Sequence, residues 1–292
     1  MELKKSHIEN LYRNLLENGR VKTKGGLHVK TVTNIANMLH ESLQEAMRDE
    51  YIIKNPAALA RVPTMRSENC AKSKIEVLTA EERKILEDNC GNDIYGTAIY
   101  MLLNTGVRIG ELLGIQWRDI DFNKGAVSIN KQVNRIKNYD SAIAAKTRLL
   151  IQHSTKTNKS TRIIPLHEEL LKRLSIYKKI QDEQKILWGD MYNDSDMVFC
   201  NECGNLIDPS TIRSHFHKKL AALGVNKIKL HALRHTFATE ALEAGVPLKA
   251  VSKILGHSSS QITADTYSHV SLELQQEAMS QIQRYKDSRN SL

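Results

Sequence analysis

The sequence has few cysteines and no long apolar run, and both absences narrow the classes of protein to which it can belong. No stretch of the 292 residues approaches the roughly 18 consecutive apolar residues that a membrane-spanning helix needs. The N-terminal segment MELKKSHIENL lacks the apolar core of a secretion signal. We therefore expect a soluble, cytoplasmic protein without a membrane partner.

Of the 4 cysteines, only Cys200 and Cys203 lie close together, in FCNECGN. A zinc site built on this CxxC would need a second pair of ligands, and the sequence has no second CxxC and no His-x-x-His pair to supply it. Cys70, His215 and His217 would join such a site only through an unusual fold. We expect reduced cysteines, no bound metal and no other cofactor.

Acidic residues are outnumbered by basic ones, 33 to 42, which leaves a formal net charge of +9. Such an excess favours a polyanionic partner such as double-stranded DNA, although a positive surface is also compatible with a role in solubility alone. The length suffices for one large domain and one small one.

One stretch, residues 231–267, has a set of side chains that suits a single reaction. His231 and Arg234 stand three residues apart at the start of an apolar-periodic segment, so a helix would present both on one face. A second helix, opened by Pro247, is predicted to end at Gly256, which places His257 in a turn. Tyr267 follows ten residues later. Two histidines, an arginine and a tyrosine are therefore expected to converge.

A phosphodiester is the substrate that suits this set. Its transition state carries negative charge on the non-bridging oxygens, and arginine offers a planar cation to hold that charge. A tyrosine hydroxyl can attack phosphorus if neighbouring cations favour the phenolate over the phenol, whose usual pKa is about 10. Upstream, Arg108 follows a Thr105-Gly106 turn, and Glu111 stands three residues on to orient it.

Several of these motifs, in this order, closely resemble those of the tyrosine recombinases of the phage and transposon integrase type. The matching phrases are TGVRIGELLGIQWRDID, TKT, HALRHTFAT, LGH and TADTYSHV, and the resemblance runs from about Leu78 to Val270. It implies a mainly α fold with a small antiparallel β-sheet, in which a helical core-binding domain precedes a mixed α+β catalytic domain.

The resemblance also implies roles for six residues. Tyr267 would attack the scissile phosphate and form a 3′-phosphotyrosyl bond with release of a 5′ hydroxyl, while His231 assists proton transfer. Lys156, preferred over Lys146 and Lys159 because it lies within TKTNKSTR, would protonate the leaving oxygen. Two arginines would neutralise the phosphate and a second histidine would bond to it: Arg108, Arg234 and His257. The implied assembly is a homotetramer on two duplexes, with accessory DNA-bending proteins as further partners.

The predicted domains are a core-binding domain at 1–64, a polar linker at 65–75 and a catalytic domain at 76–292 that ends in a helix at 271–285. Helices are predicted at 5–17 and 31–49 in the first domain, with a basic loop between them. Lys22, Lys24 and Lys30 are predicted to contact DNA phosphates, the alternative being a solvated charged loop. Because the family usually has further helices before the position of Lys5, we expect this domain to be incomplete at its N-terminus.

In the second domain, periodicity predicts helices at 80–89, 94–103 and 168–181, and another that begins after Asp208. Strands are predicted at 126–133, 148–153 and 162–166, paired in one small sheet with Lys156 at a hairpin tip. The connection 134–147 is either a basic extension that touches DNA or a neighbouring protomer, or an exposed loop.

Each matching residue also has an ordinary structural explanation when it is taken alone, so the prediction depends on their combination. One alternative function is a topoisomerase that relaxes DNA and religates the same ends, because it uses the same side chains. A second is a non-catalytic regulator, since residues 246–267 scan as a helix-turn-helix. Arg108 argues against the regulator, which would not require it.

Overall fold

The chain divides into two compact units, residues 1–74 and 75–292. The structure is a computed structural model that describes residues 3–21, 23–63, 76–137, 147–153 and 161–257, together with 259, 264, 279 and 283. The predicted linker, the helix at 271–285 as an element, and Lys22, Lys156 and Tyr267 lie outside the described residues. In the part described, no helix is both long enough and apolar enough to cross a membrane.

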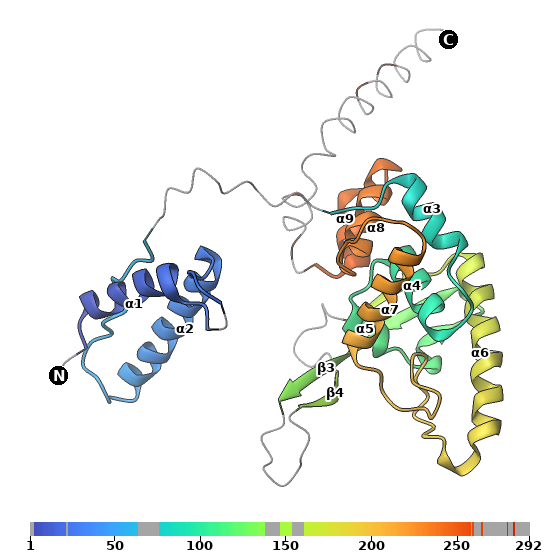
Figure 1. The fold of residues 1–292 in the computed structure, drawn as a ribbon, viewed down its shortest axis with the longest axis horizontal. Helices are drawn as coiled ribbons and strands as arrows, with labels where there is room; N and C mark the ends of the chain where they lie inside the picture. Colours follow the sequence, from blue (N-terminus) through green and yellow to red (C-terminus); the bar gives the residue numbers. More distant parts are fainter. Residues whose placement is uncertain are drawn as a thin grey trace. The chain divides into compact units, whose positions relative to one another are not determined.

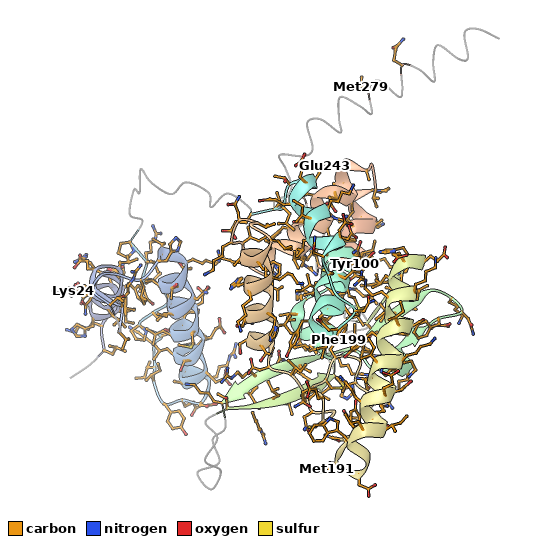
Figure 2. The ribbon with its side chains drawn as sticks, turned by 45° about the vertical axis from the view of Figure 1, so that its right-hand side comes forward. Lys24, Tyr100, Met191, Phe199, Glu243 and Met279 are labelled. Carbon is orange, nitrogen blue, oxygen red and sulfur yellow. The ribbon has the colours of Figure 1, made fainter. Side chains whose placement is uncertain are left out.

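The first unit is built from two helices, α1 (Lys5–Asn18) and α2 (Val29–Arg48). Every third or fourth residue of α1 is apolar, and this stripe packs against α2 and the segment that follows it, as the periodicity predicts. The small core contains Ile8, Tyr12, Leu16, Val32 and Ala57. The basic loop between the helices is exposed, with Lys24 on it, as Figure 2 shows.

The second unit is organised around α4 (Ile94–Thr105), which is buried along nearly its whole length. It contacts α5 (Ile109–Leu113), α6 (Glu168–Trp188), α7 (Pro209–Ala222) and α8 (Ala232–Glu243). An apolar helix surrounded in this way is the centre of a core, and Figure 1 shows α6 on one side of it and α8 on another. Two further helices, α3 (Ala80–Asp88) and α9 (Leu248–Leu255), complete the helical part.

Helix ends follow the capping signals of the sequence. Thr79 and Glu82 form a capping box at the start of α3, the helix predicted at 80–89. Asp208 accepts a hydrogen bond from the backbone N–H of Ser210, and Pro209 occupies the first position of α7. Gly256 ends α9 in the left-handed conformation, with φ 67°.

The strands form two small antiparallel sheets where one was predicted. One has the order β1-β2-β5, and the other pairs β3 with β4. Their bounds are β1 Ile120–Asp121, β2 Ala126–Ile129, β3 Lys131–Lys137, β4 Thr147–His153 and β5 Arg162–Pro165. The predicted strand 126–133 is therefore divided at Asn130, and part of the predicted connection 134–147 is strand. Since β4 and β5 belong to different sheets, a simple hairpin between these two strands was a wrong prediction.

Buried polar side chains explain the division at Asn130. The Asn130 amide donates to Asp119 Oδ1 at 3.1 Å, and Lys131 Nζ donates to Asp119 Oδ2 at 2.7 Å. These bonds tie the junction between β2 and β3 to the short 3-10 helix η1 (Trp117–Asp119). Because the chain is held at this point, β2 pairs with β5 while β3 continues outward with β4 as a two-stranded ribbon (Figure 1).

The segment Met197–Cys200 lies fully in the core. It makes isolated bridges, Gln116 with Met197 and Cys200 with Leu206, and Phe199 lies deep in the unit (Figure 2). A second 3-10 helix, η2 (Gly189–Met191), follows α6. Cys200 of the CxxC is buried, and the Gln181 side chain lies 2.9 Å from its sulfur.

Candidate active site

Arg108 stands at the point where two helices meet. The preceding helix α4 ends at Gly106, whose φ of 62° is the left-handed conformation that glycine adopts without strain. Arg108 is the N-cap residue of α5, and Glu111 in the first turn accepts its backbone N–H and its Nη1, both at 2.9 Å. The predicted contact between Glu111 and Arg108 is therefore present. The Arg108 side chain remains 42% exposed, so its guanidinium faces solvent.

Arg234 in α8 is 4% exposed and joins two loop ends. Its Nη1 donates to the carbonyl of Gly106 at 2.7 Å, and its Nη2 donates to the carbonyl of Leu255 at 2.8 Å. These carbonyls end α4 and α9, and such helix-terminal acceptors have no partner within their own helix. Arg234 therefore fixes the turn before Arg108 and the turn before His257 to the same guanidinium.

Three histidines lie around the two arginines. His231 is the N-cap residue of α8, and its ring stands perpendicular to that of His235, with centroids 5.0 Å apart. Partial desolvation, followed by the positive charges of His235, Arg234 and Arg108, lowers the pKa of His231 to about 4. Desolvation, followed by the charges of Arg234 and Arg108, lowers the pKa of His257 to about 4 as well. Both rings are neutral near pH 7 in the unbound protein.

The negative charge of Glu111 offsets part of the positive charge of its neighbours Arg108 and Arg162. Burial on its own would raise the pKa of Glu111, but the hydrogen bonds and charge of Arg162, together with Arg108, bring that pKa below its ordinary value. Glu111 is therefore ionised at neutral pH. The site remains cationic overall, and an anion such as a phosphodiester would be attracted to it.

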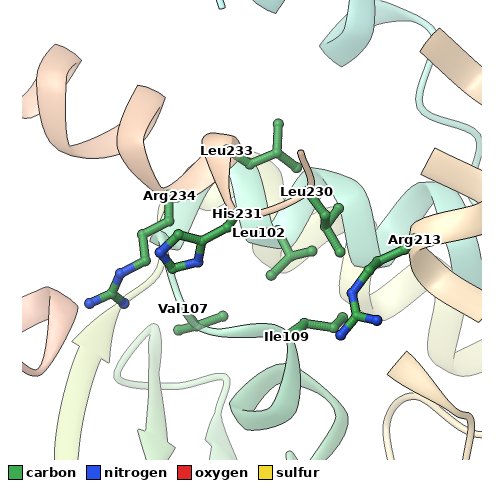
Figure 3. A pocket seen from close by; sticks show the side chains of 8 residues that line it. All are labelled: Leu102, Val107, Ile109, Arg213, Leu230, His231, Leu233 and Arg234. Carbon is green, nitrogen blue, oxygen red and sulfur yellow. The ribbon is translucent and has the colours of Figure 1, made fainter. Parts of the chain in front are cut away.

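A pocket of about 200 Å³ lies beside Arg234 of α8 and His231, the N-cap residue of that helix. Figure 3 shows His231 and Arg234 at one end and Arg213 of α7 at the other, with aliphatic side chains between them. The aliphatic members are Leu102, Val107, Ile109, Leu230 and Leu233. Arg234 and Arg213 place a positive charge at each end of the pocket, so an anion would be attracted to it.

The structure thus brings together four of the predicted site residues, Arg108, His231, Arg234 and His257. Lys24 and Lys30 belong to the first unit, where both are exposed. Lys24 lies on the loop between α1 and α2, and Lys30 lies in the first turn of α2. Their contact with DNA stays a prediction.

Sequence reasoning missed Arg162, which is buried beneath the site. Its guanidinium donates to both carboxylate oxygens of Glu111, at 3.1 and 2.7 Å. One signal was available, because alternation along β5 puts Arg162 on the same face as Ile164. A charged residue at a core-facing position of a strand needs a buried partner.

Comparisons with known proteins identify the family. Residues 76–273 match the model of the phage integrase family. A tyrosine recombinase XerC-like protein of Caldanaerobacter subterraneus subsp. tengcongensis is 33% identical over 272 residues, which are 92% of this chain and 68% of that protein. The transposase from transposon Tn916 of Enterococcus faecalis is 27% identical over 274 residues, 90% of this chain and 64% of that protein. The chain thus spans about two thirds of the length of these two relatives.

Among solved structures, the Tn1549 transposon integrase in complex with transposon right end DNA is similar in fold. Its TM-score is 0.70 at 22% identity, with 96% of this chain and 85% of that chain covered. The sequence relatives support site-specific recombination, and they do not support the relaxing enzyme or the non-catalytic regulator. On the family match and the 33% identity, the chain belongs to the phage integrase family and is a tyrosine recombinase, an enzyme of site-specific DNA recombination.

Proposed function

We propose that this recombinase cleaves DNA through Tyr267. The hydroxyl oxygen of Tyr267 forms a bond to the scissile phosphorus, and the bond from phosphorus to the 5′ oxygen breaks. The products are a 3′-phosphotyrosyl ester and a free 5′ hydroxyl. The convergence of Arg108, His231, Arg234 and His257 on one site carries the proposal, and the family match spans Lys156 and Tyr267 as well.

The reaction includes two proton transfers. His231, whose ring is neutral in the unbound protein, accepts the proton of the tyrosine hydroxyl, because a neutral imidazole has a free lone pair. Lys156 donates a proton to the departing 5′ oxygen. His257 donates a ring N–H to a phosphate oxygen. The negative charge of the phosphate raises the pKa of the His257 ring.

The two arginines stabilise the charge that develops on the phosphate oxygens. Arg234 is fixed by two carbonyls, and Arg108 is held by Glu111. Their positions are therefore set before substrate arrives, which lowers the cost of reorganisation. Since these arginines stabilise the negative charge of the transition state, the proposed cycle needs no metal or nucleotide cofactor. The phosphotyrosyl ester conserves the energy of the phosphodiester bond for religation.

Double-stranded DNA is the proposed substrate, bound by a homo-oligomer. The Tn1549 transposon integrase, similar in fold, has been solved on transposon right end DNA. We assign residues 1–64 as a core-binding domain in which Lys22, Lys24 and Lys30 contact phosphates. A tetramer joins two duplexes, with DNA-bending proteins as accessory partners, in the cytoplasm of a bacterium. The helix at 271–285 would dock either on its own protomer or on a neighbouring protomer of that tetramer.

Covalent attachment tests the proposal directly. The protein is incubated, without magnesium, with a pool of nicked duplexes of randomised sequence whose interrupted strand carries a 5′ label. Label that stays on the protein after denaturation, and is absent with Tyr267→Phe, is the expected result. Tight DNA binding with no attached label would overturn the proposed cleavage. Sequencing the attached strands would then identify the preferred site.

A further inference from the structure

Arg162 connects parts of the active site that are distant in sequence. It is the first residue of β5, and its side chain is only 7% exposed. Its Nε donates to the carbonyl of Ile254 at 2.6 Å, and its Nη atoms donate to both oxygens of Glu111. One buried guanidinium therefore links β5, the last turn of α9 and the first turn of α5.

The carboxylate of Glu111 is shared between Arg162 and Arg108. Oε1 accepts Nη1 of each arginine, at 3.1 Å from Arg162 and 2.9 Å from Arg108. Oε2 accepts Nη2 of Arg162 at 2.7 Å and the backbone N–H of Arg108 at 2.9 Å. Arg162 thus fixes the acceptor that orients both the backbone and the guanidinium of Arg108.

The same guanidinium lies under the turn that carries His257. A Cβ atom added at Gly256 would lie 2.8 Å from Nη1 of Arg162, which is closer than carbon and nitrogen approach without a bond. The neighbouring carbonyl of Leu255 accepts Nη2 of Arg234. The end of α9 is therefore held by two arginines, Arg162 on Ile254 and Arg234 on Leu255.

We propose that Arg162 is a positioning residue for DNA cleavage, which holds the Glu111 carboxylate and the end of α9 so that Arg108 and His257 meet the same phosphate. Without Arg162, Glu111 would be a buried carboxylate with Arg108 as its remaining arginine partner. It would draw the Arg108 guanidinium toward itself and away from the substrate. This inference rests on the proposed function of the site.

A purely structural ion pair is the competing explanation, and the chain offers a matched control. Lys131 and Asp119 form another buried pair in the same unit, with side chains 6% and 8% exposed against 7% and 11% for Arg162 and Glu111. Loss of either basic partner leaves a buried carboxylate. Arg162→Met and Lys131→Met should therefore destabilise the unit alike, and they should differ in catalysis.

The test uses the full chain and the duplexes recovered from the attachment experiment. Single-turnover covalent attachment and equilibrium binding to the same duplex are measured at a temperature where thermal unfolding shows every variant folded. Arg162→Met should slow attachment at least about tenfold with binding changed less than about twofold. Lys131→Met should leave the attachment rate within about twofold of the wild type. Arg162→Lys, which keeps the charge, should recover part of the rate.

A double variant separates positioning from stability. Adding Glu111→Gln to Arg162→Met removes the buried charge that draws Arg108 away from the substrate, so the double variant should attach DNA faster than Arg162→Met alone. Equal losses in Arg162→Met and Lys131→Met, or a double variant slower than Arg162→Met, would overturn the inference while the proposed function stands. A wild type that binds but never attaches DNA would overturn the proposed function, and the inference with it.

Discussion

At the scale of single residues, the two site histidines are kept neutral by their surroundings. The pKa of His231 and that of His257 lie at about 4 in the unbound protein, because of desolvation and then the neighbouring cations. We expect NMR titration, with resonances assigned through His231→Asn and His257→Asn, to show both rings uncharged at pH 6. Addition of duplex to Tyr267→Phe should raise both pKa values, since a phosphate anion favours the imidazolium.

The free energy of unfolding should decrease as the pH drops, because of the same two histidines. An unfolded histidine has a pKa of about 6.5, so between that pH and about 4 the unfolded chain binds more protons than the folded one. The contribution of these residues to the free energy of unfolding is therefore present above pH 6.5 and falls as the pH drops toward 4. Free-protein pKa values near 6.5 for both rings would contradict this account.

Gly106 offers a second residue-scale prediction. Its φ is 62°, and an added Cβ would lie 2.6 Å from Phe237 Cδ1 and 2.8 Å from Leu255 Cδ2. Gly245 has a φ of 78° with no atom within 4 Å of such a Cβ. Gly245→Ala should cost about 1–2 kcal/mol of unfolding free energy from backbone strain, and Gly106→Ala about 1–3 kcal/mol more from overpacking. Urea unfolding followed by the fluorescence of Trp117 and Trp188, both in the second unit, measures the difference; equal losses would refute it.

Sequence alone predicted the residues that carry a recognisable motif and missed one that does not. Arg108, His231, Arg234 and His257 lie together as expected because their spacing from glycine turns and helix starts is local information, and their catalytic roles stay predictions. Arg162 was missed because its partner Glu111 lies 51 positions away along the chain. Local periodicity shows that a residue faces a core, but it does not show which charge the fold brings there.

At the scale of elements, helices were predicted well and strand partners poorly. Helix starts are set by local caps such as Thr79 and Asp208, whereas α6 runs to Trp188, seven residues beyond the predicted end at 181. In the strands, inward-facing burial continues unbroken through Val127, Ile129, Lys131 and Val133. Alternation therefore gave no sign that β2 and β3 pair with different strands. That division depends on contacts with Asp119, which a local pattern does not contain.

Gln181 of α6 provides a prediction at this scale. It is 1% exposed, accepts the indole N–H of Trp117, and donates to the carbonyl of Met197 at 3.1 Å. Gln181→Leu would leave the indole N–H and this carbonyl without their partner, so we expect a loss of about 2–4 kcal/mol of unfolding free energy. Gln184→Leu, at a partly exposed position of the same helix, should cost less than about 0.5 kcal/mol. Similar urea midpoints for the two variants would contradict the role of Gln181.

At the scale of the whole molecule, the chain has a larger compact unit and a smaller helical unit, with basic residues in both. The second unit has a large core centred on α4, while the described residues of the first unit form a core of five buried apolar residues. A core that small contributes little stability by itself. The net charge of +9 belongs to the molecule as a whole, so its effect on DNA binding has to be separated from that of individual contacts.

The salt dependence of DNA binding separates the effect of net charge from that of individual contacts. Binding of the full chain to a fluorescent duplex of arbitrary sequence should weaken steeply between about 50 and 200 mM salt, because each phosphate contact releases counterions. If Lys24 and Lys30 contact phosphates, Lys24→Ala and Lys30→Ala should each reduce the slope of log K against log salt by about 1. Lys172→Ala removes the same charge from α6, where Lys172 is exposed and paired with Glu168 at 2.8 Å, and should leave the slope unchanged. Equal slopes for all three variants would show that these two lysines act only through net charge, and the assignment of the first unit as a phosphate-binding domain would then lose its support.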